Sequence, residues 1–184
     1  MSVDVVRRRF TVDEYLHMAE AGILTKRDRV ELLDGEIVEM TPSGIRHGAA
    51  VSALIRLFVT GLGERAVVWP QLTIRLSPRS APEPDVAIAR RRSYRSAYPT
   101  AEDVLLLIEV ADTSLRRDRD LKLPLYAEAG IREYWIVDVS RDEVKAYTNP
   151  SGSGYASVQT FRRGESVSPS VFPDLRIAVD EIFA

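Results

Sequence analysis

The run from Val104 to Ile108 is the most apolar stretch of the sequence, and it ends on a single carboxylate, Glu109. A strand covered on both faces reads as a continuous run of Val, Ile and Leu, whereas a half-exposed strand alternates with polar residues. The run therefore predicts a fully buried strand. An ionised Glu at its end is unfavourable unless an ion pair, hydrogen bonds or a metal ion compensate. Glu109 is thus a candidate functional residue, with pairing to a buried arginine as the alternative.

The segment after Glu109 is a polar loop followed by a helical stretch around residues 118–129, which carries Lys122. Pro124 conflicts with a regular helix there, because proline lacks the backbone N–H and clashes with the preceding turn. Either the helix begins just before Pro124 or the turn that holds Lys122 is irregular.

The N-terminal third carries two clear local signals. Thr11 and Glu14 form a capping-box pattern that predicts a short helix over residues 12–21. Asp34-Gly35 between two apolar runs predicts a tight β-hairpin, because these residues accept the positive φ angles of a two-residue turn.

The remaining elements complete an alternating pattern. Apolar residues at helical spacing predict a helix over residues 46–62, and Pro70 favours either an edge position or a bulge for the strand that contains it. This order indicates an α/β fold: a central mixed β-sheet flanked by helices, with an N-terminal helix and β-hairpin. Further strands are predicted over residues 67–76, 85–89, 133–138, 143–148, 157–161 and 175–179.

The chain length of 184 residues fits one domain over residues 1–184, in which residues 1–9 form a loose arm. The sequence has no cysteine, which excludes disulfides, Cys-based zinc sites and thiol catalysis and fits a cytoplasmic location. No apolar run approaches the ~18 residues of a membrane span, so no membrane association is expected. The net charge of −2 neither favours nor excludes nucleic acid.

Three positions could carry chemistry together: Asp85, Glu109 and Lys122. If the strands that bear the two acids are neighbours, both carboxylates meet at one edge of the sheet. Carboxylates this close repel unless a cation lies between them. With only two histidines in the chain, that cation must be a hard ion held by oxygen, such as Mg²⁺. A nearby ammonium could orient or deprotonate a water, or stabilise negative charge.

These residues resemble the Uma-two family of endonucleases, within the PD-(D/E)XK superfamily and its restriction-endonuclease-like fold. The resemblance extends from the hairpin to the C-terminus, and its specificity comes from the order and spacing of many short motifs. The matching residues are Val30 to Gly35, Pro84-Asp85-Val86, Ile108-Glu109-Val110, Asp118 to Lys122, Tyr126, Gly130, Glu133-Tyr134-Trp135 and Asp138.

The resemblance implies that Asp85 and Glu109 bind Mg²⁺ or Mn²⁺, with the main-chain carbonyl of Val110 as a further ligand. The superfamily usually places a lysine two residues after the Glu, on the same face of the strand. Here that position is Ala111, and Lys122 is the candidate replacement. Three further residues match recurring family positions and are candidates to complete the pocket: Glu31, Gln71 and His47.

Each candidate has a plainer alternative. Asp85 follows a proline and could be a turn acid, and Lys122 could be a solvated helix residue. Glu31 could face water on the hairpin, and His47 lies on an apolar stripe where a core histidine is common. The basic clusters could form a phosphate-facing rim or a solvated surface; they comprise Arg90, Arg91, Arg92, Arg95, Arg116, Arg117 and Arg119.

The sequence leaves three functional hypotheses. The first is a metal-dependent endonuclease that cleaves DNA, for which a two-fold homodimer would suit cutting of both strands. The second is a nuclease-like fold that lacks activity and serves in binding or assembly. The third is hydrolysis of small phosphodiesters.

Overall fold

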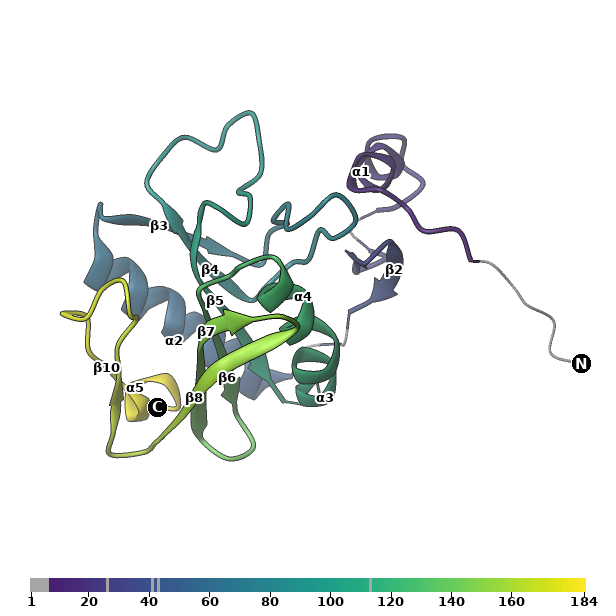
Figure 1. Ribbon diagram of the computed structural model, residues 1–184. Helices are drawn as coiled ribbons and strands as arrows, with labels where there is room; N and C mark the ends of the chain where they lie inside the picture. The colour runs from purple at the N-terminus through teal and green to yellow at the C-terminus, as the bar shows by residue number, and fades with distance from the viewer. Residues whose placement is uncertain (1–6, 26, 41, 43, 113) are drawn as a thin grey trace, which may run out of the picture.

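A six-stranded mixed sheet forms the centre of the protein (Figure 1). The structure is a computed structural model and describes residues 7–25, 27–40, 42, 44–112 and 114–184. The strand order is β3-β4-β5-β6-β7-β8, and only β5 and β6 run parallel. The mixed sheet predicted from the sequence is confirmed. The strands are β3 (Ala66–Pro70), β4 (Val86–Arg90), β5 (Val104–Ala111), β6 (Glu133–Asp138), β7 (Glu143–Ser151) and β8 (Gly154–Arg162).

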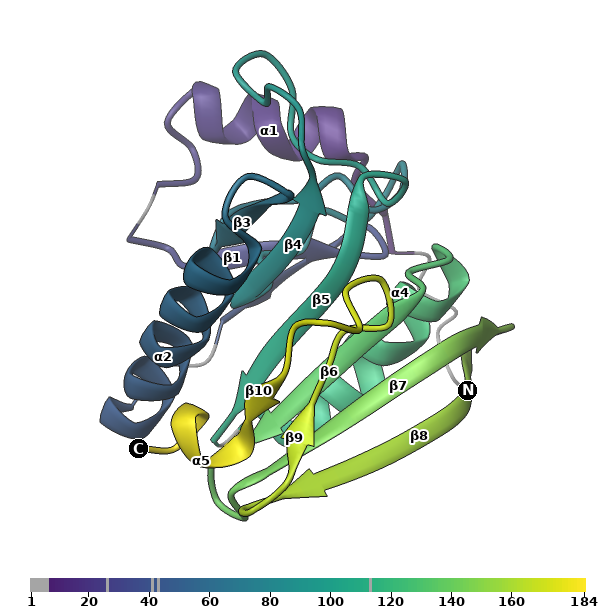
Figure 2. The same cartoon turned by 90° about the vertical axis from the view of Figure 1, so that its left-hand side faces the viewer.

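Both faces of the sheet are covered, as Figure 2 shows. One face packs against α2 (Ile45–Leu62) and against a C-terminal segment. That segment consists of β9 (Ser166–Val167), β10 (Ile177–Ala178) and α5 (Val179–Ile182). The other face packs against a helical connection between β5 and β6, which comprises α3 (Leu115–Arg117), the π-helical turn η1 (Asp118–Lys122) and α4 (Leu123–Glu128).

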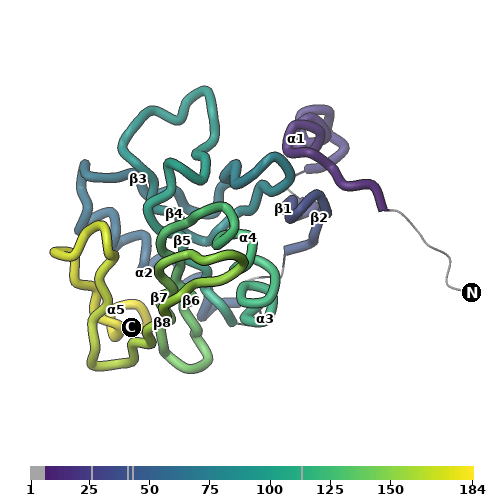
Figure 3. The backbone as a smooth tube through the Cα atoms, viewed as in Figure 1, coloured from purple at the N-terminus to yellow at the C-terminus, as the bar shows by residue number. Residues whose placement is uncertain are grey.

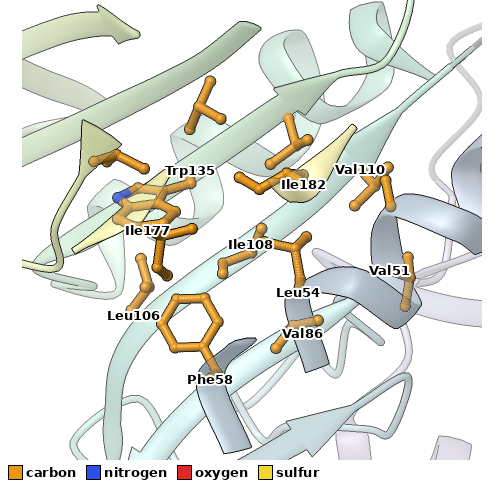
Figure 4. Close-up of a cluster of buried hydrophobic side chains, with 14 of the residues drawn as sticks. Val51, Leu54, Phe58, Val86, Leu106, Ile108, Val110, Trp135, Ile177 and Ile182 are labelled. Carbon is orange, nitrogen blue, oxygen red and sulfur yellow. The ribbon is translucent and has the colours of Figure 1, made fainter. Parts of the chain in front are cut away.

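The larger core lies between α2 and the sheet (Figure 4). Leu54 and Phe58 of α2 belong to the same buried cluster as Ile108 and Trp135. Among the described residues, α2 is long and apolar enough to cross a membrane by length and composition alone. Its buried stripe packs against the sheet, as expected of a core helix.

Alternation along β5 sends its side chains to opposite faces. Ile108 and Val110 point to the α2 side, whereas Leu107 and Ala111 point to the side of α4. Glu109 therefore faces the helical connection. This placement explains how one acid can lie in an otherwise apolar strand that is covered on both sides.

The N-terminal unit lies beside the sheet, on the side opposite the C-terminal segment (Figure 3). It contains α1 (Val12–Glu20), β1 (Val30–Leu33) and β2 (Glu36–Glu39). The predicted capping box is present. The hairpin turn is also as expected, with positive φ at both Asp34 and Gly35. A small core of Val12, Tyr15, Leu32 and Ala81 ties this unit to the loop that precedes β4.

Two predicted elements differ from the structure. The strand expected over residues 67–76 ends at Pro70, because Gln71 has a φ of 46° and turns the chain away. β3 is an edge strand, one of the two alternatives that Pro70 indicated. The helix expected over 118–129 is interrupted. The predicted arm over residues 1–9 has no regular structure at 7–9, and its first six residues lie outside the described ranges.

Pro124 explains that interruption. The backbone N–H of Leu123 donates to the carbonyl of Asp118, five residues earlier, instead of four as in an α-helix. Pro124 then occupies the start of α4, where its missing N–H is tolerated. Both alternatives raised by the sequence therefore hold: the α-helix begins at Leu123, and the turn holding Lys122 is irregular.

Candidate active site

The strand register places Asp85 beside Glu109. Val86 pairs with Ile108 in the antiparallel ladder of β4 and β5, so one step further Asp85 lies opposite Glu109. The backbone N–H of Val110 donates to Asp85 Oδ2 at 2.8 Å. Residues opposite one another in such a ladder have Cβ atoms about 5 Å apart on one face. The sheet thus brings together the two acids that the sequence singled out.

These two acids line a pocket that is unusually rich in charge. It is built by β1, the start of α2, the loop before β4, the end of β5 and the η1 turn. Four basic side chains also line it: Arg29, His47, Arg117 and Lys122. The carboxylates that line it are Glu31, Glu83, Asp85, Glu109, Asp112 and Asp118.

Three donors orient the Asp85 carboxylate. Besides the Val110 N–H on Oδ2, His47 Nε2 lies 3.0 Å from Oδ2 and Gln71 Nε2 lies 3.4 Å from Oδ1. The hydrogen bond to Asp85 raises the pKa of His47, although burial opposes this. His47 Nδ1 is buried and has no hydrogen-bond partner among the described residues. Of the supporting candidates, His47 and Gln71 therefore contact Asp85 directly.

The Glu109 carboxylate is held by Lys122 and Tyr126. Lys122 Nζ lies 3.0 Å from Glu109 Oε1, and the Tyr126 hydroxyl donates to the same oxygen at 2.8 Å. Lys122 Nζ is also 3.0 Å from Oε2 of Glu31. Glu31, Glu109 and Lys122 are 0%, 3% and 4% exposed, so this is a buried ion-pair network. The hairpin, the central strand and the η1 turn meet at one ammonium group.

The charges of this network set its protonation. Burial alone would lower the pKa of Lys122, but the carboxylates of Glu109, Glu31 and Asp118 outweigh it, and the pKa lies above its ordinary value. Burial raises the pKa of Glu109 well above its usual range, and the ammonium of Lys122 opposes that rise. Lys122 therefore remains an ammonium at neutral pH.

The π-helical turn directs Lys122 into the pocket. Asp118 and Lys122 bound this turn, and both are buried and line the pocket. Single π-helical turns occur frequently at functional sites. Lys122 thus reaches Glu109 from the helical connection between β5 and β6, and not from the strand position of Ala111.

Several pocket residues were not singled out by the sequence. Asp118 appeared there only within the family-matching run Asp118 to Lys122, with no role of its own. Its spacing of four from Lys122 on a predicted helix was the available signal, because such residues share a face. Arg29 is likewise two residues before Glu31, the spacing that places side chains on one face of a strand. Asp112 and Glu83 carried no comparable signal.

The predicted basic rim is divided by the structure. Arg117 lines the pocket, whereas its neighbour Arg116 does not. Arg90 ends β4, at the opposite end of the strand from Asp85, and its Nε donates to the carbonyl of Glu102. Arg91 forms an ion pair with Glu64 at 2.9 Å. The structure does not bring Arg90 or Arg91 to the acids.

Asp118→Asn is expected to stabilise the protein at neutral pH. Burial raises the pKa of Asp118 from 3.8 to about 6, against the opposing effects of Lys122 and Ser114. The folded state therefore binds this proton more tightly, and the free energy of unfolding falls as the pH rises through that range. Above it, the variant should gain up to about 3 kcal/mol. Urea unfolding at pH 4 and pH 7.5 measures the difference.

The gain should be mostly lost at pH 4, because the carboxyl is then protonated in the folded state and about half protonated in the unfolded state. Asp120→Asn, at an exposed position on the same turn, is the matched control and should show no such pH dependence. An Asp118→Asn variant that is less stable than the wild type at pH 7.5 would contradict this reading of the pocket.

The sheet, its flanking helices and the acids at the junction of β4 and β5 define a restriction-endonuclease-like protein. The chain belongs to the Uma2 family, whose model, described as "Putative restriction endonuclease", matches residues 12–180. Among solved structures, the chain is similar to the crystal structure of a "putative nuclease belonging to DUF820" from Anabaena variabilis. That similarity has a TM-score of 0.74 at 15% identity and covers 95% of this chain and 97% of the other. No curated protein matches the sequence significantly.

Proposed function

We propose that the protein is a metal-dependent endonuclease that hydrolyses phosphodiester bonds of DNA. The observation that carries this proposal is the convergence of Asp85, Glu109 and Lys122 in one pocket. The membership in a family described as a restriction endonuclease supports the nuclease class. The solved nuclease-named neighbour supports the fold.

The oxygen atoms of the pocket fit a hard divalent cation. Oε1 of Glu109 accepts from Lys122 and Tyr126, but no described residue donates to its Oε2. Oε1 of Glu31 is buried and without a hydrogen-bond partner among the described residues. Mg²⁺ takes one or two protein carboxylates and keeps several waters. Among the described residues, no group of three or more His, Cys, Asp or Glu side chains is arranged to hold a metal ion.

Within this proposal, Asp85, Glu109 and the main-chain carbonyl of Val110 would hold Mg²⁺ or Mn²⁺. When bound there, such an ion would supply an activated water and neutralise charge on the phosphodiester. His47 and Gln71 keep the Asp85 carboxylate in one orientation. Such outer contacts commonly tune metal affinity, because they fix ligand rotamers.

Lys122 serves as a fixed positive charge. Its raised pKa keeps the ammonium protonated, which disfavours removal of a proton from water by this residue. A buried ammonium beside the acids instead stabilises the negative charge that develops on the phosphate. The sequence left open whether this lysine acts on the attacking water or stabilises negative charge. Its raised pKa favours charge stabilisation.

The test of this function is cleavage of three substrates in parallel: supercoiled plasmid, single-stranded DNA and a small nitrophenyl phosphodiester. Each is incubated with Mg²⁺, with Mn²⁺ and with a chelator. The proposal expects metal-dependent nicking or linearisation of DNA. Turnover of the small diester alone would favour the third hypothesis, and no turnover of any substrate would favour the inactive module.

Tyr126→Phe is expected to weaken the metal site while the fold remains intact. The change removes the 2.8 Å hydrogen bond to Glu109 Oε1 and frees the carboxylate to rotate. Loss of such an outer contact typically lowers metal affinity by about 10–100-fold. Titration of Mn²⁺ into both proteins measures the change. Tyr155→Phe is the matched control, because the Tyr155 hydroxyl is buried without a partner among the described residues. Equal Mn²⁺ affinities for Tyr126→Phe and the wild type would contradict the assignment.

A further inference from the structure

Two pocket residues have a backbone conformation that their side chains disfavour. Among the described residues, five non-glycine positions have positive φ: Arg29, Asp34, Gln71, Asp142 and Asn149. Asp and Asn tolerate this region well, whereas Arg and Gln do so less readily. Arg29 and Gln71 both line the acidic pocket. Such unfavourable conformations concentrate at functional sites, where surrounding contacts hold them.

Gln71 already has an explanation, because its side chain contacts Asp85. Arg29 does not. Its carbonyl accepts from the backbone N–H of Met40 at 2.8 Å, across the base of the hairpin. The carbonyl of the next residue, Val30, accepts from the Tyr15 hydroxyl of α1 at 2.8 Å. The N-terminal unit therefore fixes the backbone of Arg29 at the pocket.

The charge of Arg29 is not neutralised by an ion pair with a described residue, although it opposes the rise that burial causes in the pKa of Glu83. No carboxylate of a described residue lies within the 4.0 Å of an ion pair from Arg29, and the same holds for Arg117. Lys122, in contrast, is neutralised by Glu31 and Glu109 at 3.0 Å each. Arg29 is exposed, whereas Glu31, two residues further on, is fully buried.

Two arginines from distant parts of the chain thus line the pocket: Arg29 directly precedes β1, and Arg117 ends α3. Six carboxylates line the same space, yet neither guanidinium is drawn into an ion pair with them. Guanidinium groups match phosphate oxygens with two parallel hydrogen bonds. This arrangement suits a polyanion whose phosphate groups contact the arginines while its reacting phosphate lies at the acids.

We propose that Arg29 binds a backbone phosphate of the nucleic-acid substrate at the pocket of Asp85 and Glu109, with Arg117 as a second phosphate contact at the same pocket. The N-terminal helix and hairpin accordingly form a substrate-binding arm of the site. This inference rests on the proposed function and identifies the residues that seat the substrate.

The test compares Arg29→Ala, Arg29→Lys and Arg29→Gly with the wild type in steady-state cleavage of a labelled DNA duplex at several salt concentrations. Arg29→Ala should raise KM by about tenfold with a smaller change in kcat. It should also reduce the salt slope of log kcat/KM by about 0.9, the value for one lost phosphate contact. Arg29→Lys keeps the charge and should retain the slope. Arg27→Ala is the control, because Arg27 is exposed and absent from the pocket lining.

Arg29→Gly separates substrate binding from a structural role. Glycine accepts a φ of 45° without strain, so the variant should melt no lower than the wild type. It should nevertheless lose affinity for DNA as Arg29→Ala does. The proposal would be overturned if Arg29→Gly lost melting temperature and activity together. It would also be overturned if the variant kept the KM and the salt slope of the wild type. If the wild type cleaves DNA and the variants match it, only this inference fails; a wild type that neither binds nor cleaves nucleic acid overturns the proposed function as well.

Discussion

Glu109→Gln and Asp85→Asn are each expected to reduce metal-dependent cleavage of plasmid DNA by roughly a thousandfold or more, since a bound divalent ion contributes several kcal/mol of transition-state stabilisation. Both substitutions preserve the shape of the side chain and remove only the negative charge. Glu109 lines the pocket and accepts hydrogen bonds from described residues on Oε1 alone, and Asp85 lies opposite it in the sheet. Initial rates at saturating Mg²⁺ and Mn²⁺ measure the loss.

The matched control for these variants is Asp120→Asn, an exposed acid of the η1 turn that does not line the pocket. It should cleave at the wild-type rate. Thermal melting of all three variants checks that the loss is not caused by unfolding. If Asp85→Asn and Glu109→Gln cleaved DNA at close to the wild-type rate, the activity would belong to another site or to another protein.

Lys122→Met should reduce both activity and stability strongly. The substitution keeps the length of the side chain but leaves Glu31 and Glu109 buried without their counter-ion. Removal of one partner from a buried ion pair costs about 3–5 kcal/mol. Urea unfolding at pH 7.5 measures that loss, and the cleavage rate should fall by orders of magnitude in the fraction that remains folded.

The double variant Glu31→Gln/Lys122→Met distinguishes the two effects. The double variant removes the unpaired buried charge of Glu31, so part of the lost free energy of unfolding should return while the cleavage rate stays low. Lys145→Met is the control, because the ammonium of Lys145 also pairs with a glutamate, at 3.4 Å, but is more exposed. Its loss should cost at most about 1 kcal/mol. Full recovery of cleavage in the double variant would show that Lys122 acts only in folding.

The central strand and the meeting of the two acids were accessible from the sequence because both follow from short-range pattern. A continuous apolar run specified a strand buried on both faces, and β5 is such a strand. Asp-Gly specified the hairpin turn, and Thr11 with Glu14 specified the start of α1. Asp85 directly precedes β4 and Glu109 lies near the end of β5, so antiparallel pairing of the two strands was enough to bring the acids together.

Long-range features were less accessible. The position of Lys122 depends on a π-helical turn, which Pro124 permits but does not specify. The end of β3 depends on Gln71, whose positive φ is maintained by bonds from its N–H to the carbonyls of Pro84 and Asp85. Residues far apart in sequence create these constraints, so local propensity could not reveal them.

The basic residues show the same limit for the site. Charge clusters at Arg90 and Arg116 were visible in the sequence, but the presence of charge does not indicate which part of the fold each side chain faces. The structure turns Arg90 to the far end of β4 and directs Arg117 to the pocket. Arg29 lay outside the basic clusters singled out from the sequence, and it lines the pocket only because the hairpin folds beside the sheet.

The most direct test of the account is calorimetric titration of Mn²⁺ into the wild type and into the double variant Asp85→Asn/Glu109→Gln at pH 7.5. The account expects saturable binding to the wild type at or below millimolar Mn²⁺ and no binding to the double variant. Absence of heat from the wild type at millimolar Mn²⁺, or equal binding by both proteins, would contradict the assignment of these two acids as the metal site.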